Sequence, residues 1–173
     1  MRTLYDADHE AFRESFASFV AKEVSPHYLE WEEAGIAPRE MYASAGQYGF
    51  VGMAIPEQYG GGGTDDFRFN AILSEEFNAA GIGGAGLGLT LHNDICTPYF
   101  IEYCTDEQAD RWMPGIASGD LITAVAMTEP GIGSDVRGMK CSARADGDDF
   151  VINGTKHFIS HADEADFVIL YAA

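Results

Sequence analysis

The spacing of apolar residues changes once along the chain, near Asp120, and this change restricts the fold more than any other feature. Before it, apolar side chains recur every three or four residues, which is typical of amphipathic helices. After it, short apolar runs alternate with turn sequences, which is typical of strands. We therefore expect a multi-domain chain, with an N-terminal all-α domain over residues 1–119 and the first part of a β domain over residues 120–173.

The first domain is expected to contain several amphipathic helices. Residues 6–33 carry a row of phenylalanines on one face, and Pro26 is expected to kink or interrupt this helix. Thr105 and Gln108 form the pattern of a capping box. The other expected features, in chain order, are a helix at 38–48, a helix capped by Thr64 or Asp65 that reaches Phe77, a glycine-rich bend at 81–88, a helix at 89–103 and a helix that Pro114 and Gly119 close.

The second domain is expected to be an incomplete antiparallel sheet of barrel-like form. Asp146-Gly147-Asp148 and Asn153-Gly154 both favour hairpin turns, which pair neighbouring strands antiparallel. The last run reaches Ala173 without a closing turn, so we expect the chain to be a piece of something longer. The expected strands are Leu121–Met127, Met139–Ala145, Phe150–Asn153, His157–Ser160 and Phe167–Tyr171.

The charge balance narrows the classes of partner. A formal net charge of −18, from 28 acidic and 10 basic side chains, opposes binding to phosphate backbones and anionic membranes. We therefore expect no nucleic-acid partner and no membrane partner. No apolar run approaches the roughly 18 residues of a spanning helix, and the N-terminus lacks a signal-peptide core, so we expect a cytoplasmic protein. The three cysteines lack a Cys-x-x-Cys pair, which favours a reduced compartment.

Three shorter patterns carry less weight. Gly81–Gly86 matches the dinucleotide-binding pattern G-x-G-x-x-G, but a helical pattern precedes it where a strand is needed. His157 and His161 lie four residues apart in a strand-like segment, so we expect no metal site there. Ser134 lacks the Gly-x-Ser-x-Gly context of a hydrolase nucleophile.

The stretch Val125–Asp135 runs from an apolar strand into a polar, glycine-rich turn. Its Glu-Pro-Gly sequence turns the chain, while Gly131 and Gly133 permit positive φ and carry no Cβ that would hold a ligand away. Thr128 and Ser134 add a hydroxyl on each side. The pattern predicts a cradle of exposed backbone for a flat, polar ligand.

Several motifs together resemble those of the acyl-CoA dehydrogenases, flavoproteins that desaturate acyl thioesters. The sequence Met-Thr-Glu-Pro-Gly-Ile-Gly-Ser-Asp at Met127–Asp135 resembles the family signature. Ile152–Lys156 resembles the family's Asn-Gly-x-Lys, and Phe158–Ser160 stands where the family usually has Trp-Ile-Thr. Ile55–Gly61 and Pro114–Asp120 resemble parts of the N-terminal domain. The resemblance covers essentially the whole chain.

The resemblance implies a fold and a set of binding residues. Family members have an N-terminal helical domain, a middle β domain and a C-terminal helical bundle, and we expect the bundle to be absent from this chain. The implied contacts with FAD and acyl-CoA are Met127 and Thr128 at the flavin ring, Gly133 at the pyrophosphate, Ser134 beside the cofactor and at the pantetheine arm of the substrate, Phe158 against one face of the ring, Ile159 beside the cofactor, and Ser160 near flavin N5.

The implied reaction is the FAD-dependent α,β-desaturation of an acyl-CoA in fatty-acid breakdown. A carboxylate base removes the α-proton, and hydride passes from the β-carbon to flavin N5. The family's base comes from the C-terminal bundle, so we expect no catalytic residue in this chain. Glu129, which lies in a turn, is expected to have a structural role.

The resemblance also implies partners and leaves alternatives open. The expected partners are an electron-transfer flavoprotein or similar acceptor and further copies of the chain in a homodimer or homotetramer. The alternatives are an acyl-CoA oxidase, a flavin monooxygenase on the same scaffold, and a non-catalytic half-length subunit of a heteromeric dehydrogenase.

Overall fold

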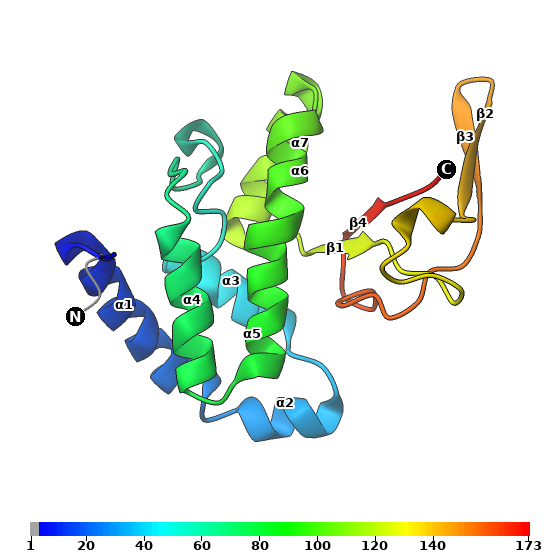
Figure 1. Ribbon diagram of the computed structural model, residues 1–173. Coiled ribbons are helices and arrows are strands. Elements are labelled where there is room, and N and C mark those ends of the chain that lie inside the picture. Colours follow the sequence, from blue (N-terminus) through cyan, green and yellow to red (C-terminus); the bar gives the residue numbers. More distant parts are fainter. Residues whose placement is uncertain (1–3) are drawn as a thin grey trace. The chain divides into compact units, whose positions relative to one another are not determined.

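The computed structural model describes residues 4–173, which divide into two compact units. The first unit ends at Ile122 and is helical; the second spans Thr123–Ala173 and contains all the strands of the described chain (Figure 1). None of the helices in residues 4–173 combines the length and the apolar character that crossing a bilayer requires.

The helical unit consists of seven α-helices together with short π and 3₁₀ segments, all within residues 4–122. In chain order these elements are α1 (Ala7–Phe19), η1 (Val20–Val24), α2 (Tyr28–Ala34), α3 (Arg39–Gln47), η2 (Glu57–Tyr59), α4 (Arg68–Ala79), α5 (Gly83–Thr90), η3 (Leu91–Cys96), α6 (Thr97–Tyr103) and α7 (Asp106–Ser118).

An aromatic cluster forms the centre of this unit. The ring of Phe16 meets the rings of Phe50 and Phe77 edge-on, at centroid distances of 4.8 and 5.0 Å. All three side chains are buried. Edge-to-face pairs of this kind add about 0.5–1.5 kcal/mol each to the stabilisation from apolar burial. The row of phenylalanines that predicts an amphipathic first helix is thus the core face of α1.

The helix ends confirm some expectations and correct others. Pro26 lies in the turn between η1 and α2, so the predicted interruption is confirmed. The capping box at Thr105 is confirmed as well, since Thr105 and Gln108 exchange side-chain and backbone hydrogen bonds. The predicted cap of α4 by Thr64 or Asp65 is wrong, because that helix begins at Arg68, whose backbone N–H donates to the Asp66 carboxylate at 3.1 Å.

Pro114 does not close α7, contrary to the sequence expectation. The helix continues through it to Ser118 and ends at Gly119, which adopts the left-handed conformation at φ 77°. Ile116 and Ala117 are buried in the last turn, and the ring Nε2 of the buried His92 donates to the Ile116 carbonyl at 3.1 Å. Tertiary packing of this turn therefore outweighs the hydrogen bond that the proline removes.

The glycine-rich segment is helical rather than a bend. Only Ala80–Ile82 turn the chain, and α5 begins at Gly83. Gly86 is buried against α4, where an added Cβ would lie 2.6 Å from Cγ of Phe77. The missing side chain is thus what allows α4 and α5 to lie close together. Glycine here serves packing, not a turn.

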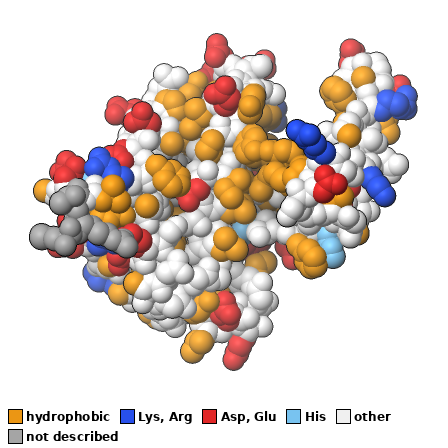
Figure 2. All heavy atoms as spheres, in the orientation of Figure 1, with side chains coloured by type: hydrophobic (Ala, Val, Ile, Leu, Met, Phe, Trp, Pro, Cys, Tyr) orange, Lys and Arg blue, Asp and Glu red, His pale blue; other side chains and the backbone are white. Residues whose placement is uncertain are grey.

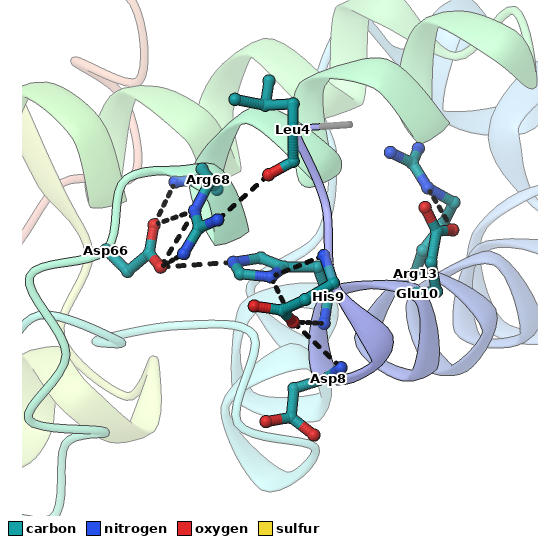
Figure 3. Close-up of polar contacts among 8 residues, drawn as sticks. Leu4, Asp8, His9, Glu10, Arg13, Asp66 and Arg68 are labelled. Atoms are coloured by element: carbon teal, nitrogen blue, oxygen red, sulfur yellow. Dashed lines mark hydrogen bonds and ion pairs between the residues drawn. The ribbon is translucent and has the colours of Figure 1, made fainter. Parts of the chain in front are cut away.

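A polar cluster fixes the start of α1 to the start of α4 (Figure 3). The buried imidazole of His9 lies between two carboxylates, with Nδ1 2.7 Å from Asp6 and Nε2 3.2 Å from Asp66. Its ring stacks on Phe69 at 4.5 Å, and Arg68 pairs with Asp66 and donates to the Leu4 carbonyl. Asp6 and His9 also form a capping box at the first turn of α1.

The β unit contains two separate strand pairs. The strands are β1 (Thr123–Ala126), β2 (Ser142–Asp146), β3 (Asp149–Asn153) and β4 (Phe167–Leu170). β2 and β3 form the predicted antiparallel hairpin, with Gly147 at φ 67° in its two-residue turn. β1 pairs with β4 in parallel, so the antiparallel expectation is wrong for this pair. The connection between β1 and β4 is long enough for a crossover, so no short turn forces the strands to be antiparallel.

Two further expectations for this unit are wrong. Asn153-Gly154 does not turn into a hairpin, because the chain leaves β3 into a loop; a Cβ on Gly154 would lie 2.6 Å from Cα of Cys141. His157–Ser160 is not a strand: Phe158 adopts φ 56°, and just beyond the segment His161 adopts φ 63°. Residues with positive φ cannot continue a pleated strand.

Candidate functional site

The candidate site lies in the β unit, where β1 leads into a tight turn. The backbones of Glu129 and Ile132 pair with each other, with N···O distances of 3.3 and 3.1 Å, so Pro130 and Gly131 form the tip. Gly131 and Gly133 permit positive φ, but neither of them adopts it. The open space expected at both positions is present, because an added Cβ on either glycine would meet no atom within 4 Å.

The side chain of Glu129 points into the protein and joins the turn to the start of β2. One carboxylate oxygen accepts the backbone N–H of Lys140 at 2.8 Å, and the other accepts that of Cys141 at 2.9 Å. These backbone hydrogen bonds, assisted by the Lys156 ammonium, lower the pKa of Glu129 to about 2 despite the opposing effect of desolvation. The group is therefore a fixed anion at neutral pH.

Lys156 reaches the same carboxylate from the loop after β3. Its Nζ lies 3.0 Å from Oε1 of Glu129 and donates to the Met127 carbonyl at 3.1 Å. The two charged side chains are only 9% and 5% exposed. A buried ammonium is costly unless it is paired and hydrogen-bonded, and this one meets both conditions.

The loop that follows Lys156 runs beside the turn. The His157 backbone N–H donates to the Thr128 carbonyl at 2.9 Å, which places the two segments next to each other. The next residue, Phe158, is 82% exposed, and its ring stacks on that of His157 at 3.7 Å. A bulky side chain that combines positive φ with almost complete exposure is unusual in a folded protein and is consistent with a surface built for binding.

The structure brings together some of the residues that the sequence nominates. Met127 and Thr128 lie beside the loop that carries Phe158, through the hydrogen bonds of Lys156 and His157. Gly133 and Ser134 are exposed farther along the turn. Ile159 and Ser160 follow in the same loop and are half-buried.

The pairing of Glu129 with Lys156 is the feature that sequence reasoning missed. Both residues lie within the motifs that define the resemblance, but nothing in their spacing indicates that they meet. One signal was available: a lysine between a strand and an apolar segment has to be exposed or paired. The other histidine of the loop, His161, lies 3.7 Å from Glu164, and its burial lowers its pKa.

Comparisons with known proteins agree with this architecture. The family described as "Acyl-CoA dehydrogenase, N-terminal domain" matches residues 6–120, and "Acyl-CoA dehydrogenase, middle domain" matches residues 124–173. The mitochondrial long-chain specific acyl-CoA dehydrogenase of Sus scrofa is 40% identical over 172 residues, which is 99% of this chain and 39% of that protein. The chain thus spans about two fifths of the length of such curated relatives.

Solved structures give the same result. An acyl-CoA dehydrogenase from Geobacillus kaustophilus has a TM-score of 0.93 and 40% identity, covering 99% of this chain and 44% of that one. A glutaryl-CoA dehydrogenase from Mycobacterium smegmatis, solved in complex with FADH2, has a TM-score of 0.89 and 30% identity, covering 98% and 43%. Family matches to both units, together with relatives at this level of identity, show that the chain belongs to the acyl-CoA dehydrogenase family.

Proposed function

We propose that this chain provides the flavin-binding wall of an FAD-dependent acyl-CoA dehydrogenase. The observation that carries the proposal is Phe158, an exposed aromatic ring in a strained conformation that directly follows His157, whose N–H donates to the Thr128 carbonyl. Holding a non-glycine residue at such a φ costs about 1–3 kcal/mol. A flavin needs an apolar wall on one ring face and hydrogen bonds at its edge, and these two residues are of the types that provide them.

The turn fits the phosphate part of the same cofactor. Gly131 and Gly133 leave space where a side chain would stand, so a ligand can approach the backbone closely. Ser134 adds an exposed hydroxyl. The β unit also carries less of the negative charge, with four basic and eight acidic side chains, than the helical unit, which has six and twenty. An anionic cofactor is thus repelled less strongly by the β unit.

FAD, when bound, would supply the hydride acceptor for the desaturation of an acyl thioester. We propose that Ser134 contacts both FAD and the substrate. The residues proposed to hold FAD alone are Met127, Thr128, Gly133, Phe158, Ile159 and Ser160. Glu129 is not proposed as the base, because its carboxylate accepts three hydrogen bonds from Lys140, Cys141 and Lys156 and stays ionised. The proton-abstracting carboxylate is proposed to come from outside this chain.

We propose the remaining parts of the role on the same basis. Acyl-CoA is the substrate, an electron-transfer flavoprotein or similar protein is the acceptor, and the working enzyme is a homodimer or homotetramer. The names of the relatives, such as long-chain specific acyl-CoA dehydrogenase, support a place in fatty-acid breakdown. A partial middle domain following the helical domain supports a family enzyme over an unrelated flavoprotein.

Uptake of FAD by the purified protein is the primary test. The protein is incubated with excess FAD, passed through a desalting column and examined for visible flavin absorbance. We expect the flavin to co-elute with the protein. If the folded protein retains no flavin at saturating cofactor, the proposal is wrong. A second test adds the polypeptide that carries the catalytic base. Bleaching of the bound flavin by an acyl-CoA in the absence of oxygen then tests desaturation, and peroxide formed in the presence of oxygen would indicate an oxidase.

The Thr128 hydroxyl provides a sharper prediction. Thr128→Val keeps the branched shape and removes the hydroxyl, so it should weaken FAD binding by about 0.5–1.5 kcal/mol, which is tenfold or less. The backbone carbonyl that accepts the His157 N–H is unchanged. Titration with FAD, followed by flavin fluorescence, measures the effect. An unchanged dissociation constant would remove Thr128 from the proposed contacts.

A further inference from the structure

The buried pair Glu129–Lys156 joins three separate segments of the β unit. Glu129 belongs to the turn after β1, Lys156 to the loop after β3, and the two N–H donors of Lys140 and Cys141 to the segment that enters β2. Each partner makes more than one contact, because Lys156 also donates to the Met127 carbonyl. These bonds close a single network around one carboxylate.

The residues on either side of this pair are those proposed to hold FAD. The Met127 carbonyl accepts a hydrogen bond from Lys156 Nζ, and the Thr128 carbonyl accepts one from the backbone N–H of His157, the residue after the lysine. Phe158 follows at once. Moving Lys156 away from Glu129 would therefore shift the backbone of both segments, even though neither charged group lies at the exposed surface.

We infer that Glu129–Lys156 is a positioning pair, which sets the distance and orientation of the Thr128 segment relative to the Phe158 loop. The inference rests on the proposed function, since it assigns a purpose to the spacing of these segments. The pair acts through the backbone: Lys156 holds the Met127 carbonyl, and Glu129 holds the start of β2. Its own charges compensate each other, so they leave no net charge for the ligand to meet.

A pair that only stabilised the fold would have a different signature. Its removal would lower the unfolding temperature. The molecules that remain folded would still bind FAD with unchanged affinity, and the optical signal of the bound flavin would also be unchanged. A positioning pair alters both in folded protein. The visible circular dichroism of bound flavin reports the asymmetry of its surroundings and therefore separates the two roles.

Lys156→Met is the first variant, because methionine keeps an unbranched apolar stem and removes the ammonium. Lys140→Met is the matched control: the Lys140 side chain is exposed, and its backbone N–H still reaches Glu129. In protein shown by far-ultraviolet circular dichroism to be folded, we expect Lys156→Met to weaken FAD binding about tenfold or more. The visible circular dichroism of flavin bound to Lys156→Met should also change, while Lys140→Met should match the wild type in FAD affinity and in this spectrum.

Glu129→Gln keeps the test decisive if Lys156→Met does not fold. Glutamine has the shape of glutamate but presents an NH₂ group where a carboxylate oxygen accepted a backbone N–H. Weaker FAD binding with an altered spectrum supports the positioning role. Wild-type affinity and spectrum in a folded variant would overturn it. If the wild-type protein itself binds no FAD, the proposed function fails instead, and the two results are distinguishable.

Discussion

Phe158 shows how a residue can oppose folding and still suit a binding surface. Its ring is exposed, so it contributes little apolar burial, and its backbone occupies a region of φ that costs energy. The hydrogen bonds of Lys156 and His157 on its N-terminal side hold the loop in place against that cost. At this scale the local conformation is explained by its neighbours and not by its own preference.

Gly133 should matter for binding and not for folding. Because a Cβ there meets nothing and its φ is not positive, Gly133→Leu should change the free energy of unfolding by less than about 0.5 kcal/mol. The bulky side chain would fill the space proposed for the cofactor, so FAD binding should be lost. Thermal unfolding and FAD titration measure the two effects.

Gly154→Ala is the control with the opposite expectation. Its Cβ would lie 2.6 Å from the backbone of Cys141, so the variant should be destabilised by about 1–3 kcal/mol. If Gly133→Leu destabilised the protein as much as Gly154→Ala, the glycine would be needed by the fold, and the reason for assigning it to the ligand would disappear.

At the scale of elements, α4 and α5 are held together by a glycine. Gly86→Ala should destabilise the helical unit by about 1–3 kcal/mol, because its Cβ would overlap the ring of Phe77. Gly83→Ala, at the first residue of α5, meets no atom within 4 Å and should be neutral or stabilising by up to about 1 kcal/mol. Denaturant unfolding of the two variants measures the difference, and equal stabilities would contradict close packing through Gly86.

The junction of α1 with α4 should make stability depend on pH in the acid range. The hydrogen bond from Arg68 lowers the pKa of Asp66, and the one from His9 lowers that of Asp6. Groups with a lowered folded pKa stabilise the protein above their ordinary pKa, near 4, and this contribution is lost as the pH falls through the lowered value. Stability should therefore decrease as the pH falls below about 4.

Asp66→Asn tests that contribution. The variant should be less stable than the wild type at neutral pH, and the difference should shrink as the pH falls from about 4 toward 2. Asp65→Asn, an exposed neighbour, is the control and should follow the wild type. Thermal unfolding measured across this range decides the matter; a difference that is constant with pH would rule out the ionised form of Asp66 as the source.

At the scale of the whole molecule, local signals in the sequence were sufficient for much of the fold. The change of periodicity near Asp120, the break at Pro26 and the capping box at Thr105 are each determined by neighbouring residues, and the structure contains all three. The hairpin turn at Gly147 is local in the same way. The family then follows from motifs that run through both units.

The predictions from sequence are wrong where contacts between residues distant in the chain determine the structure. Pro114 stays inside α7 because buried neighbours hold the last turn, and Gly86 lies inside α5 because close packing against Phe77 leaves no room for a Cβ. The parallel pairing of β1 with β4 cannot be read from either strand alone. The ion pair between Glu129 and Lys156, at the centre of the candidate site, also joins residues that are distant in the sequence. None of these contacts appears as a pattern over neighbouring residues.

The parallel pairing has a consequence for folding kinetics. Every residue proposed to contact FAD lies between β1 and β4, so the pairing of Thr123 with Phe167 closes the segment that carries all of them. Closing a connection of that length costs about 3 kcal/mol in chain entropy, and contacts so distant in sequence form slowly. A cofactor that binds only the closed state shifts the equilibrium toward it by mass action. Flavin would therefore slow amide hydrogen exchange in β1 and β4, two strands that it need not touch.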